Sequence, residues 1–221
     1  TGNRLKRRQE EESTEDDKAI KAGKKGVSKN YVHIELFAGI GTGMDVVEKV
    51  GGKLPKARIV AENDLEIRRV QCDQRGFSID KRWARDKKGT PTLYLENVWE
   101  TIDKYAESIR QLLTWIHEGG VVTVLSGSPC QDHTASTHLQ GWMGWTGERS
   151  VHGHVVYLIF WILQNIAPHV ETVYVGENAG SMKEMHKQYW AKMLGLTVQD
   201  VYLRKASKYG HAERNRLFAT N

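Results

Sequence analysis

A cysteine follows an apolar segment in a turn built from small residues and proline. The segment Val121–Ser126 runs into Gly127-Ser128-Pro129-Cys130-Gln131. A thiolate is a strong nucleophile, and it forms near neutral pH where N–H donors or positive charges stabilise it. Because proline restricts the turn and its neighbours are small, we predict that Cys130 is a reactive thiol. Cys72 has no such surroundings and is typical of a small core residue.

An acid and two arginines follow other apolar segments. Glu177 comes directly after Thr172–Gly176, where partial desolvation would raise its pKa toward the range useful for proton donation. Arg214 and Arg216 open the segment Arg214–Thr220 and would share one face of a strand. The arginines are also compatible with an ordinary surface ion-pair cluster.

A glycine-rich turn, Gly39-x-Gly41-x-Gly43, joins a predicted strand to a predicted helix. Glycine lets the backbone approach a ligand closely, and the helix N-terminus offers N–H donors. Glu62 follows the next strand about 20 residues later, where an acid can hydrogen-bond a ribose. The spacing is neither GxxxxGK[ST] nor GxGxxG, so it favours a nucleoside with a short charged tail, such as S-adenosylmethionine. A purely structural turn and an exposed loop acid are the alternatives.

Strands and helices that alternate along the chain must position these residues. The predicted strands are Val32–Phe37, Ala57–Ala61, Thr92–Leu95, Val121–Ser126, Thr172–Gly176, Val198–Arg204 and Arg214–Thr220. The predicted helices are Gly43–Val50, Leu65–Arg75, Val98–His117, Val155–Ala167 and Met182–Leu194. This alternation is typical of an α/β fold whose mostly parallel sheet has helices on both faces. Ligands of such sheets bind beyond the carboxyl ends of the strands, where the residues above lie.

Composition limits the class of protein. The length of 221 residues suits one domain, and an apolar content of 39% is too high for a wholly disordered chain. Two cysteines and no apolar run of membrane-spanning length predict a soluble, intracellular protein of the cytoplasm or nucleus. A formal charge of +5 permits nucleic-acid binding. We expect residues 1–30 to form a charged tail or exposed helix and residues 31–221 to form the domain.

The order of these motifs resembles the DNA cytosine-5 methyltransferase family. The resemblance rests on Glu35-Leu36-Phe37-Ala38-Gly39-Ile40-Gly41, Glu62, Ser128-Pro129-Cys130-Gln131, Glu177-Asn178 and Arg214-x-Arg216. The sequence is similar both to bacterial members of this family and to the catalytic domains of its eukaryotic de novo enzymes. The resemblance implies the Rossmann-like fold of S-adenosylmethionine-dependent methyltransferases, with a mostly parallel, seven-stranded sheet.

The resemblance also implies roles for individual residues. Cys130 would attack C6 of a cytosine flipped out of duplex DNA, and Glu177 would bind and protonate the N3 edge. Arg216 would contact O2, and Arg214 would order the site. The residues that would contact the base or its surroundings are Ser128, Gln131 and Asn178. The residues that would hold S-adenosylmethionine, and S-adenosylhomocysteine after transfer, are Phe37, Ala38, Gly39, Ile40, Gly41, Thr42, Gly43, Glu62, Asn63, Asn97 and Pro129.

Departures from the family pattern are informative. Asn97 stands where the family carries an aspartate for the adenine amino group, and the target-recognition region is absent. Either the sequence is part of a longer chain, or a second chain supplies that region. An RNA cytosine-5 methyltransferase and a non-catalytic, cofactor-binding scaffold are the alternative functions.

Two further features complete the expectations. Residues 134–150 form a candidate mobile loop in which Trp142, Met143 and Trp145 either pack against the domain or insert into DNA. The four histidines His133, His138, His152 and His154 lack cysteine or carboxylate partners at zinc-site spacing, so no metal is expected.

Overall fold

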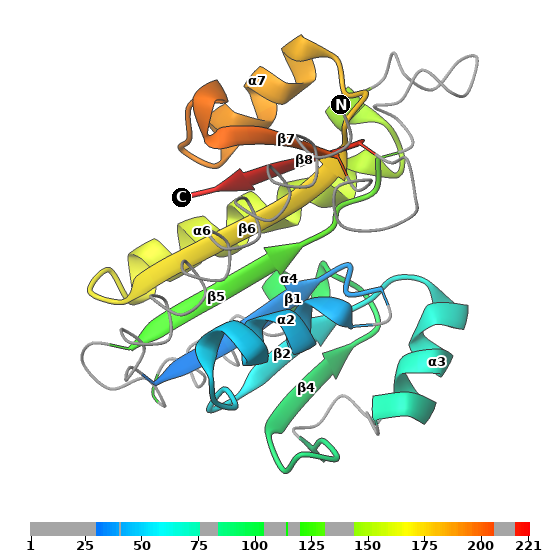
Figure 1. Cartoon of the computed structure of the whole chain (residues 1–221), viewed down its shortest axis with the longest axis vertical. Coiled ribbons are helices and arrows are strands. Elements are labelled where there is room, and N and C mark those ends of the chain that lie inside the picture. The colour runs from blue at the N-terminus through cyan, green and yellow to red at the C-terminus, as the bar shows by residue number, and fades with distance from the viewer. Residues whose placement is uncertain are drawn as a thin grey trace, which may run out of the picture.

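A single twisted sheet forms the centre of the protein (Figure 1). The computed structural model describes residues 30–39, 41–75, 84–103, 114, 120–130, 144–205 and 215–221. Its eight strands have the order β3-β4-β2-β1-β5-β6-β8-β7. The strands are β1 Tyr31–Leu36, β2 Arg58–Ala61, β3 Ala84–Arg85, β4 Pro91–Leu95, β5 Val121–Ser126, β6 Glu171–Ala179, β7 Val201–Lys205 and β8 Asn215–Thr220.

Five neighbouring strands are parallel and end at the same edge. Leu36 of β1 pairs with Ala61 of β2 and with Ser126 of β5. Ala61 also pairs with Leu95 of β4, and Ser126 pairs with Gly176 of β6. The loops that leave β1, β2, β4 and β5 therefore start side by side. The prediction of a largely parallel α/β sheet is confirmed.

Helices cover both faces of the sheet (Figure 1). The helices are α2 Thr42–Gly51, α3 Leu65–Arg75, α4 Glu100–Asp103, α6 His154–Ile166 and α7 Glu184–Met193, with 3-10 turns η3 Gly144–Thr146, η4 Ser150–Gly153 and η5 Val198–Asp200. Strand alternation sends side chains to each layer in turn. On β2, Ile59 packs in the cluster that contains α6 and α7 residues, whereas Val60 packs against Met44 of α2.

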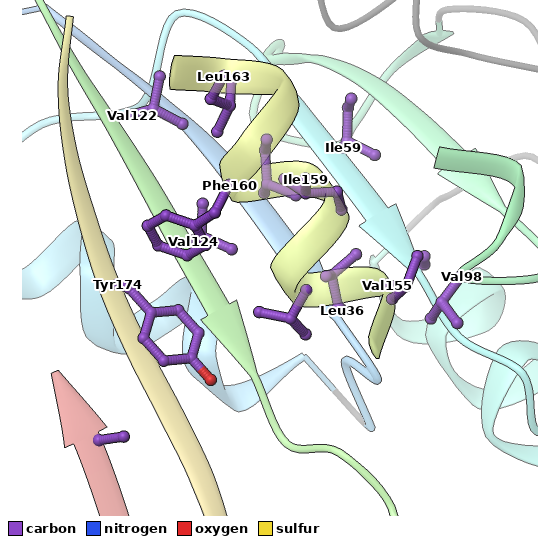
Figure 2. Packing of buried hydrophobic residues seen from close by; sticks show 14 of the residues in the cluster. Leu36, Ile59, Val98, Val122, Val124, Val155, Ile159, Phe160, Leu163 and Tyr174 are labelled. Carbon is purple, nitrogen blue, oxygen red and sulfur yellow. The ribbon is translucent and has the colours of Figure 1, made fainter. Parts of the chain in front are cut away.

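The larger core lies between the sheet and α6 (Figure 2). Its centre is Ile159, with Val155 and Leu163 one turn before and after it, all 2% exposed or less. Phe160 meets Tyr174 of β6 edge to face, with the ring centroids 5.2 Å apart. Each fully buried aliphatic side chain contributes about 1.5–3 kcal/mol. This core holds β5, which leads into the turn of Cys130, and β6, which carries Glu177.

Three predictions about the sheet need correction. β6 continues to Ala179 instead of ending at Gly176, because β8 pairs with it as far as Ala179. β7 starts at Val201 instead of Val198, because Thr197 and Asp200 form a capping box that closes a 3-10 turn first. The sheet also has an eighth, two-residue strand, β3. β3, β7 and β8 are antiparallel to their neighbours.

Parts of the expectations fall outside the described residues. The tail, apart from Asn30, is one of them, and most of the predicted helix Val98–His117 is another; α4 is its described beginning. Within the part of the chain that the structure describes, no helix is both long and apolar enough to cross a membrane.

Candidate active site

The turn after β1 has an unusual backbone. Phe37, Gly39 and Gly41 have φ angles of 55°, 55° and 78°. Such angles are routine for glycine but cost a residue with a Cβ about 1–2 kcal/mol. Gly41 is the N-cap of α2, so the turn aims the first N–H groups of that helix at the same edge of the sheet. Local strain at Phe37 is typical of a functional turn.

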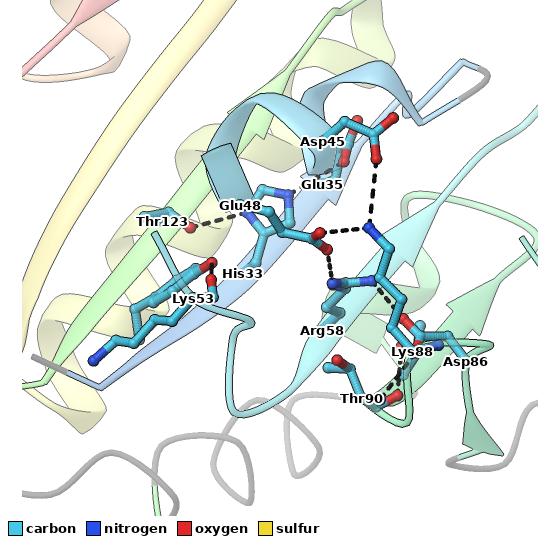
Figure 3. Close-up of polar contacts among 12 residues, drawn as sticks. His33, Glu35, Asp45, Glu48, Lys53, Arg58, Asp86, Lys88, Thr90 and Thr123 are labelled. Carbon is cyan, nitrogen blue, oxygen red and sulfur yellow. Dashed lines mark hydrogen bonds and ion pairs between the residues drawn. The ribbon is translucent and has the colours of Figure 1, made fainter. Parts of the chain in front are cut away.

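Gly43 is required for a different reason, namely space. A Cβ added there would stand 2.7 Å from Glu35 Oε1 and 2.9 Å from Leu125 Cδ1. Glu35 lies buried beneath α2, and its Oε2 is 3.2 Å from His33 Nε2 (Figure 3). His33 Nδ1 in turn lies 2.9 Å from Thr123 Oγ1. A buried polar chain thus supports the glycine turn from below.

Glu62 lies at the end of β2, directly beside this turn. Its Oε2 accepts the N–H of Gly39 at 2.7 Å, and its Oε1 accepts the N–H of Asp64 at 2.9 Å. Gln71 of α3 donates to the carbonyl of Gly39. A carboxylate can accept about four hydrogen bonds, so both Glu62 oxygens can still accept hydrogen bonds from a pair of ribose hydroxyls. The predicted neighbourhood of the glycine turn and Glu62 is therefore confirmed, with Gln71 as an addition.

Asn63 and Asn97 hold the neighbouring turns in place. Asn63 Oδ1 accepts the N–H of Val98 at 2.9 Å, which ties the turn after β2 to the turn after β4. Asn97 is exposed, and its Oδ1 accepts the N–H of Trp99 at 2.9 Å. Asn97 Nδ2 is a donor, so a contact with an adenine amino group would have to use the remaining lone pair of Oδ1.

Two hydrogen bonds hold the turn of Cys130. Asn178 Nδ2 donates to Ser128 Oγ at 3.1 Å, and Ser150 Oγ donates to the carbonyl of Pro129 at 3.2 Å. Ser128 is 6% exposed and Asn178 is fully buried, whereas Cys130 is half-buried. The geometry gives Ser128 and Asn178 a supporting position behind the turn, and their expected contact with substrate stays a prediction.

Glu177 and Arg216 form an ion pair beside the same turn. Arg216 Nε contacts Glu177 Oε1, and a Cβ added at Gly127 would stand 3.6 Å from Glu177 Oε2. β8 is antiparallel and pairs Arg216 with Ala179, so the arginine reaches the carboxyl edge of the sheet. The Glu177 side chain is 36% exposed, which agrees with the expected partial desolvation, and its raised pKa stays a prediction. Carboxylate, guanidinium and the start of the cysteine turn are nevertheless neighbours.

The end of the candidate mobile loop is packed. Trp145 is 3% exposed, donates from Nε1 to the carbonyl of His186 at 2.9 Å, and lies beside Trp190. Ser150 is fully buried. Packing, the alternative to DNA insertion, is therefore confirmed for Trp145. The predicted loop boundary at residue 150 is wrong, because the chain is anchored from residue 144 onward.

Several predicted site residues lie outside the described residues. They are Ile40, Gln131, Arg214 and the loop residues 131–143. Among the residues that the structure does describe, no group of three histidine, cysteine or acidic side chains could hold a metal ion.

Burial alters two titrating groups near the site. Burial, with smaller effects from neighbouring charges, raises the pKa of the Cys72 thiol on α3. Burial also lowers the pKa of His186 on α7, and Lys183 adds to the effect by charge repulsion. The Cys72 side chain therefore has a lower thiolate fraction at neutral pH than an ordinary cysteine.

Sequence reasoning missed three contributors to this region. Gly127 belongs to the predicted cysteine turn but was not singled out as a neighbour of Glu177, and Ser150 was not predicted to hold Pro129. Trp99 Nε1 donates to His152 Nδ1 at 2.6 Å. The 53 residues between them hide this pair from any local pattern.

Comparisons with known proteins show the fold. No model of a known family matches the sequence, and no curated protein does either. Among solved structures, the methyltransferase EhMeth of Entamoeba histolytica superposes with a TM-score of 0.53 at 16% identity over 87% of this chain. The matched part spans only 53% of EhMeth. Weaker likenesses include M. capricolum TrmK in complex with S-adenosylhomocysteine (TM-score 0.37, 9% identity, 91% of this chain and 66% of TrmK). The chain has the Rossmann-like α/β fold found in the methyltransferase EhMeth.

Proposed function

We propose that this chain is the catalytic domain of an S-adenosylmethionine-dependent DNA cytosine-5 methyltransferase. The observation that carries the proposal is the meeting of Glu177, Arg216 and the turn of Cys130 at one edge of the sheet. A thiol, a carboxylate and a guanidinium at the carboxyl ends of neighbouring strands suit addition to an electron-poor ring and proton transfer to it.

The turn after β1 fits the proposed cofactor. A Cβ at Gly39 would meet nothing within 4 Å, so there is open space above a backbone N–H that Glu62 already holds. Glu62 would take the ribose hydroxyls, and the N-terminus of α2 would face the carboxylate of the methionine part. When bound, S-adenosylmethionine supplies an electrophilic methyl group on a positively charged sulfur.

Cys130 and Glu177 would share the activation of the ring. The Cys130 sulfur forms a bond to C6 of a flipped cytosine, and the C5–C6 π electrons move toward C5. Glu177, positioned by Arg216, acts in its protonated form: it donates a hydrogen bond or its proton to N3 and so stabilises the negative charge. C5 is then nucleophilic enough to take the methyl group. A solvent water then takes the C5 proton, the C5–H electrons re-form the C5–C6 double bond, the C6–S electron pair returns to Cys130, and N3 returns its proton to Glu177, which releases 5-methylcytosine.

Covalent trapping tests this proposal. The protein is incubated with S-adenosylmethionine and duplex DNA that contains 5-fluorocytosine, and adducts are resolved by denaturing electrophoresis. Fluorine at C5 prevents the final elimination, so a working enzyme stays attached to DNA. We expect an adduct with the native chain and with the matched control Cys72→Ala, and none with Cys130→Ala.

The other outcomes separate the alternative functions. An adduct with fluorinated RNA but not with DNA would replace the proposal by an RNA cytosine-5 methyltransferase. Binding of S-adenosylmethionine without an adduct on either nucleic acid would favour the scaffold. The trap is run on long, mixed-sequence DNA, so that a weakly recognised site is still present.

A further inference from the structure

The segment Gly144–Gly153 contacts two parts of the candidate site, namely the turn that carries Cys130 and the turn after β4 that is expected to lie beside the cofactor. We call it the bridging segment. On the nucleophile side, Ser150 Oγ donates to the carbonyl of Pro129 at 3.2 Å. A Cβ added at Gly153 would stand 3.5 Å from Ser128 Cβ, so the backbone of the segment rests on the cysteine turn itself.

The other contact of the bridging segment reaches the cofactor side. His152 Nδ1 accepts a hydrogen bond from Trp99 Nε1 at 2.6 Å, and the two rings meet edge to face at 61°. Trp99 belongs to the turn after β4, where its N–H is held by Asn97 and the N–H of Val98 is held by Asn63. Asn63 and Asn97 are the residues expected to face the adenosine part.

The chemistry of this hydrogen bond restricts His152. The indole N–H is the only polar group of a tryptophan side chain and can only donate. His152 Nδ1 must therefore carry a lone pair, and the ring proton of the neutral imidazole lies on Nε2. An asparagine at the same position offers an amide oxygen close to the place of Nδ1, whereas phenylalanine keeps the edge-to-face ring contact without any acceptor.

We propose that His152 is a positioning residue that couples occupancy of the adenosine site to the placement of Cys130. A ligand that fixes the turn of Asn97 and Trp99 also fixes His152, and through Ser150 and Pro129 it restrains the cysteine turn. The inference rests on the cofactor part of the proposed function and does not depend on DNA as the substrate.

The test follows the reactivity of Cys130 while adenosine binds. Adenosine is the probe because it lacks the methionine tail and cannot shield the sulfur through it. Modification of Cys130 by iodoacetamide is timed by mass spectrometry of the Cys130 peptide, with and without saturating adenosine, and calorimetry measures binding in parallel. The Cys72 peptide gives an internal reference in each sample.

A hydrogen bond of about 1 kcal/mol corresponds to about a fivefold effect, so we expect adenosine to slow Cys130 modification about fivefold in the native chain. The measured ratio is the rate of Cys130 modification without adenosine divided by the rate with adenosine. In His152→Phe and Trp99→Phe this ratio falls to near one although adenosine still saturates the protein. The double variant, which combines His152→Phe with Trp99→Phe, has the same ratio as either single variant. His152→Asn, which keeps an acceptor for Trp99, retains the slowing by adenosine. His154→Phe is the matched control, since it keeps the ring contacts of His154 with Trp145 and Tyr189 and removes the bond to the Val151 carbonyl, which lies on the same segment but does not involve Trp99.

Three results would overturn the coupling. They are an unchanged ratio in His152→Phe, the same loss in His154→Phe, or a native ratio of one with adenosine bound. Failure of the native chain to bind adenosine overturns the cofactor assignment as well, and calorimetry reveals that case separately. Loss of the DNA adduct with intact coupling overturns only the choice of substrate.

Discussion

Asn178 at the end of β6 donates a hydrogen bond to Ser128 at the start of the cysteine turn, with 3.1 Å between Nδ2 and Oγ. Asn178 Oδ1 is also used, since it accepts the N–H of Ala179 at 2.8 Å. The strand that carries Glu177 and the turn that carries Cys130 are therefore joined behind the reactive groups.

Replacement of Asn178 by alanine should damage both stability and activity. The change leaves buried groups without partners, which costs about 1–3 kcal/mol. It also releases Ser128, so adduct formation by Cys130 should slow more than binding of S-adenosylmethionine weakens. Urea unfolding and the fluorocytosine trap measure the two effects. Asn165→Ala on the exposed end of α6 is the control, and an equal loss there would contradict the assignment.

Alanine at Gly39 and at Gly43 should be harmful for different reasons. At Gly39 the cost comes from φ alone and is about 1–2 kcal/mol, so Gly39→Asn should be milder than Gly39→Ala because asparagine tolerates this region. At Gly43 the cost comes from contact with Glu35 and Leu125, so the larger asparagine should be worse than alanine. The urea midpoints of the alanine and asparagine variants at both positions measure this. Asparagine should be the more stable variant at Gly39 and alanine at Gly43, and the same order of stability at both positions would refute the explanation.

Arg58 should be the most sensitive cation of the described sheet. It is 3% exposed and lies between Asp86 and Glu48, which Figure 3 shows with their contacts. Removing one partner of such a buried network costs about 3–5 kcal/mol, so Arg58→Met should strongly lower the free energy of unfolding. Arg68→Met removes a pair with the more exposed Glu96 and should cost about 1 kcal/mol or less. Comparable losses in urea unfolding would contradict this ranking.

Acid should weaken the packing of α7 through His186. Its ring lies against Gly144, and burial lowers its pKa from the ordinary value of 6.5. The unfolded chain then binds the proton more tightly, so the contribution is complete above the unfolded value and is lost as pH falls below it. Between pH 7 and pH 5 the native chain should lose more stability than His186→Gln. Equal pH slopes of the urea midpoints would disprove the role of His186.

The parallel half of the fold was predictable from the sequence, and the helix Leu65–Arg75 even has the predicted bounds. Short apolar runs between helices identify those strands, because β1, β2 and β4 are buried on both faces and β5 alternates between buried and partly buried residues. The antiparallel end was less predictable, since the length of β6 depends on pairing with β8, about 40 residues away in sequence. The start of β7 was mispredicted because the side chains of Thr197 and Asp200 outcompete the strand.

The residues of the candidate site were largely predictable, but their supports were not. Gly39 and Glu62 lie together as expected, because the ends of parallel strands share an edge. Contacts such as Trp99 with His152 depend on how two distant turns pack, which leaves no periodic signal in the sequence. Trp145 was ambiguous for a related reason: glycine neighbours suit a mobile loop, whereas packing against Trp190 decides for the core.

The placement of β8 between β6 and β7 has a consequence for biosynthesis. β8 is made after β7, yet it lies inside the sheet, so β7 can take its final place only once β8 has inserted. During translation the thiol of Cys130 and the carboxylate of Glu177 emerge well before the guanidinium of Arg216. The ion pair between Glu177 and Arg216 can therefore form only after β8 has been synthesised.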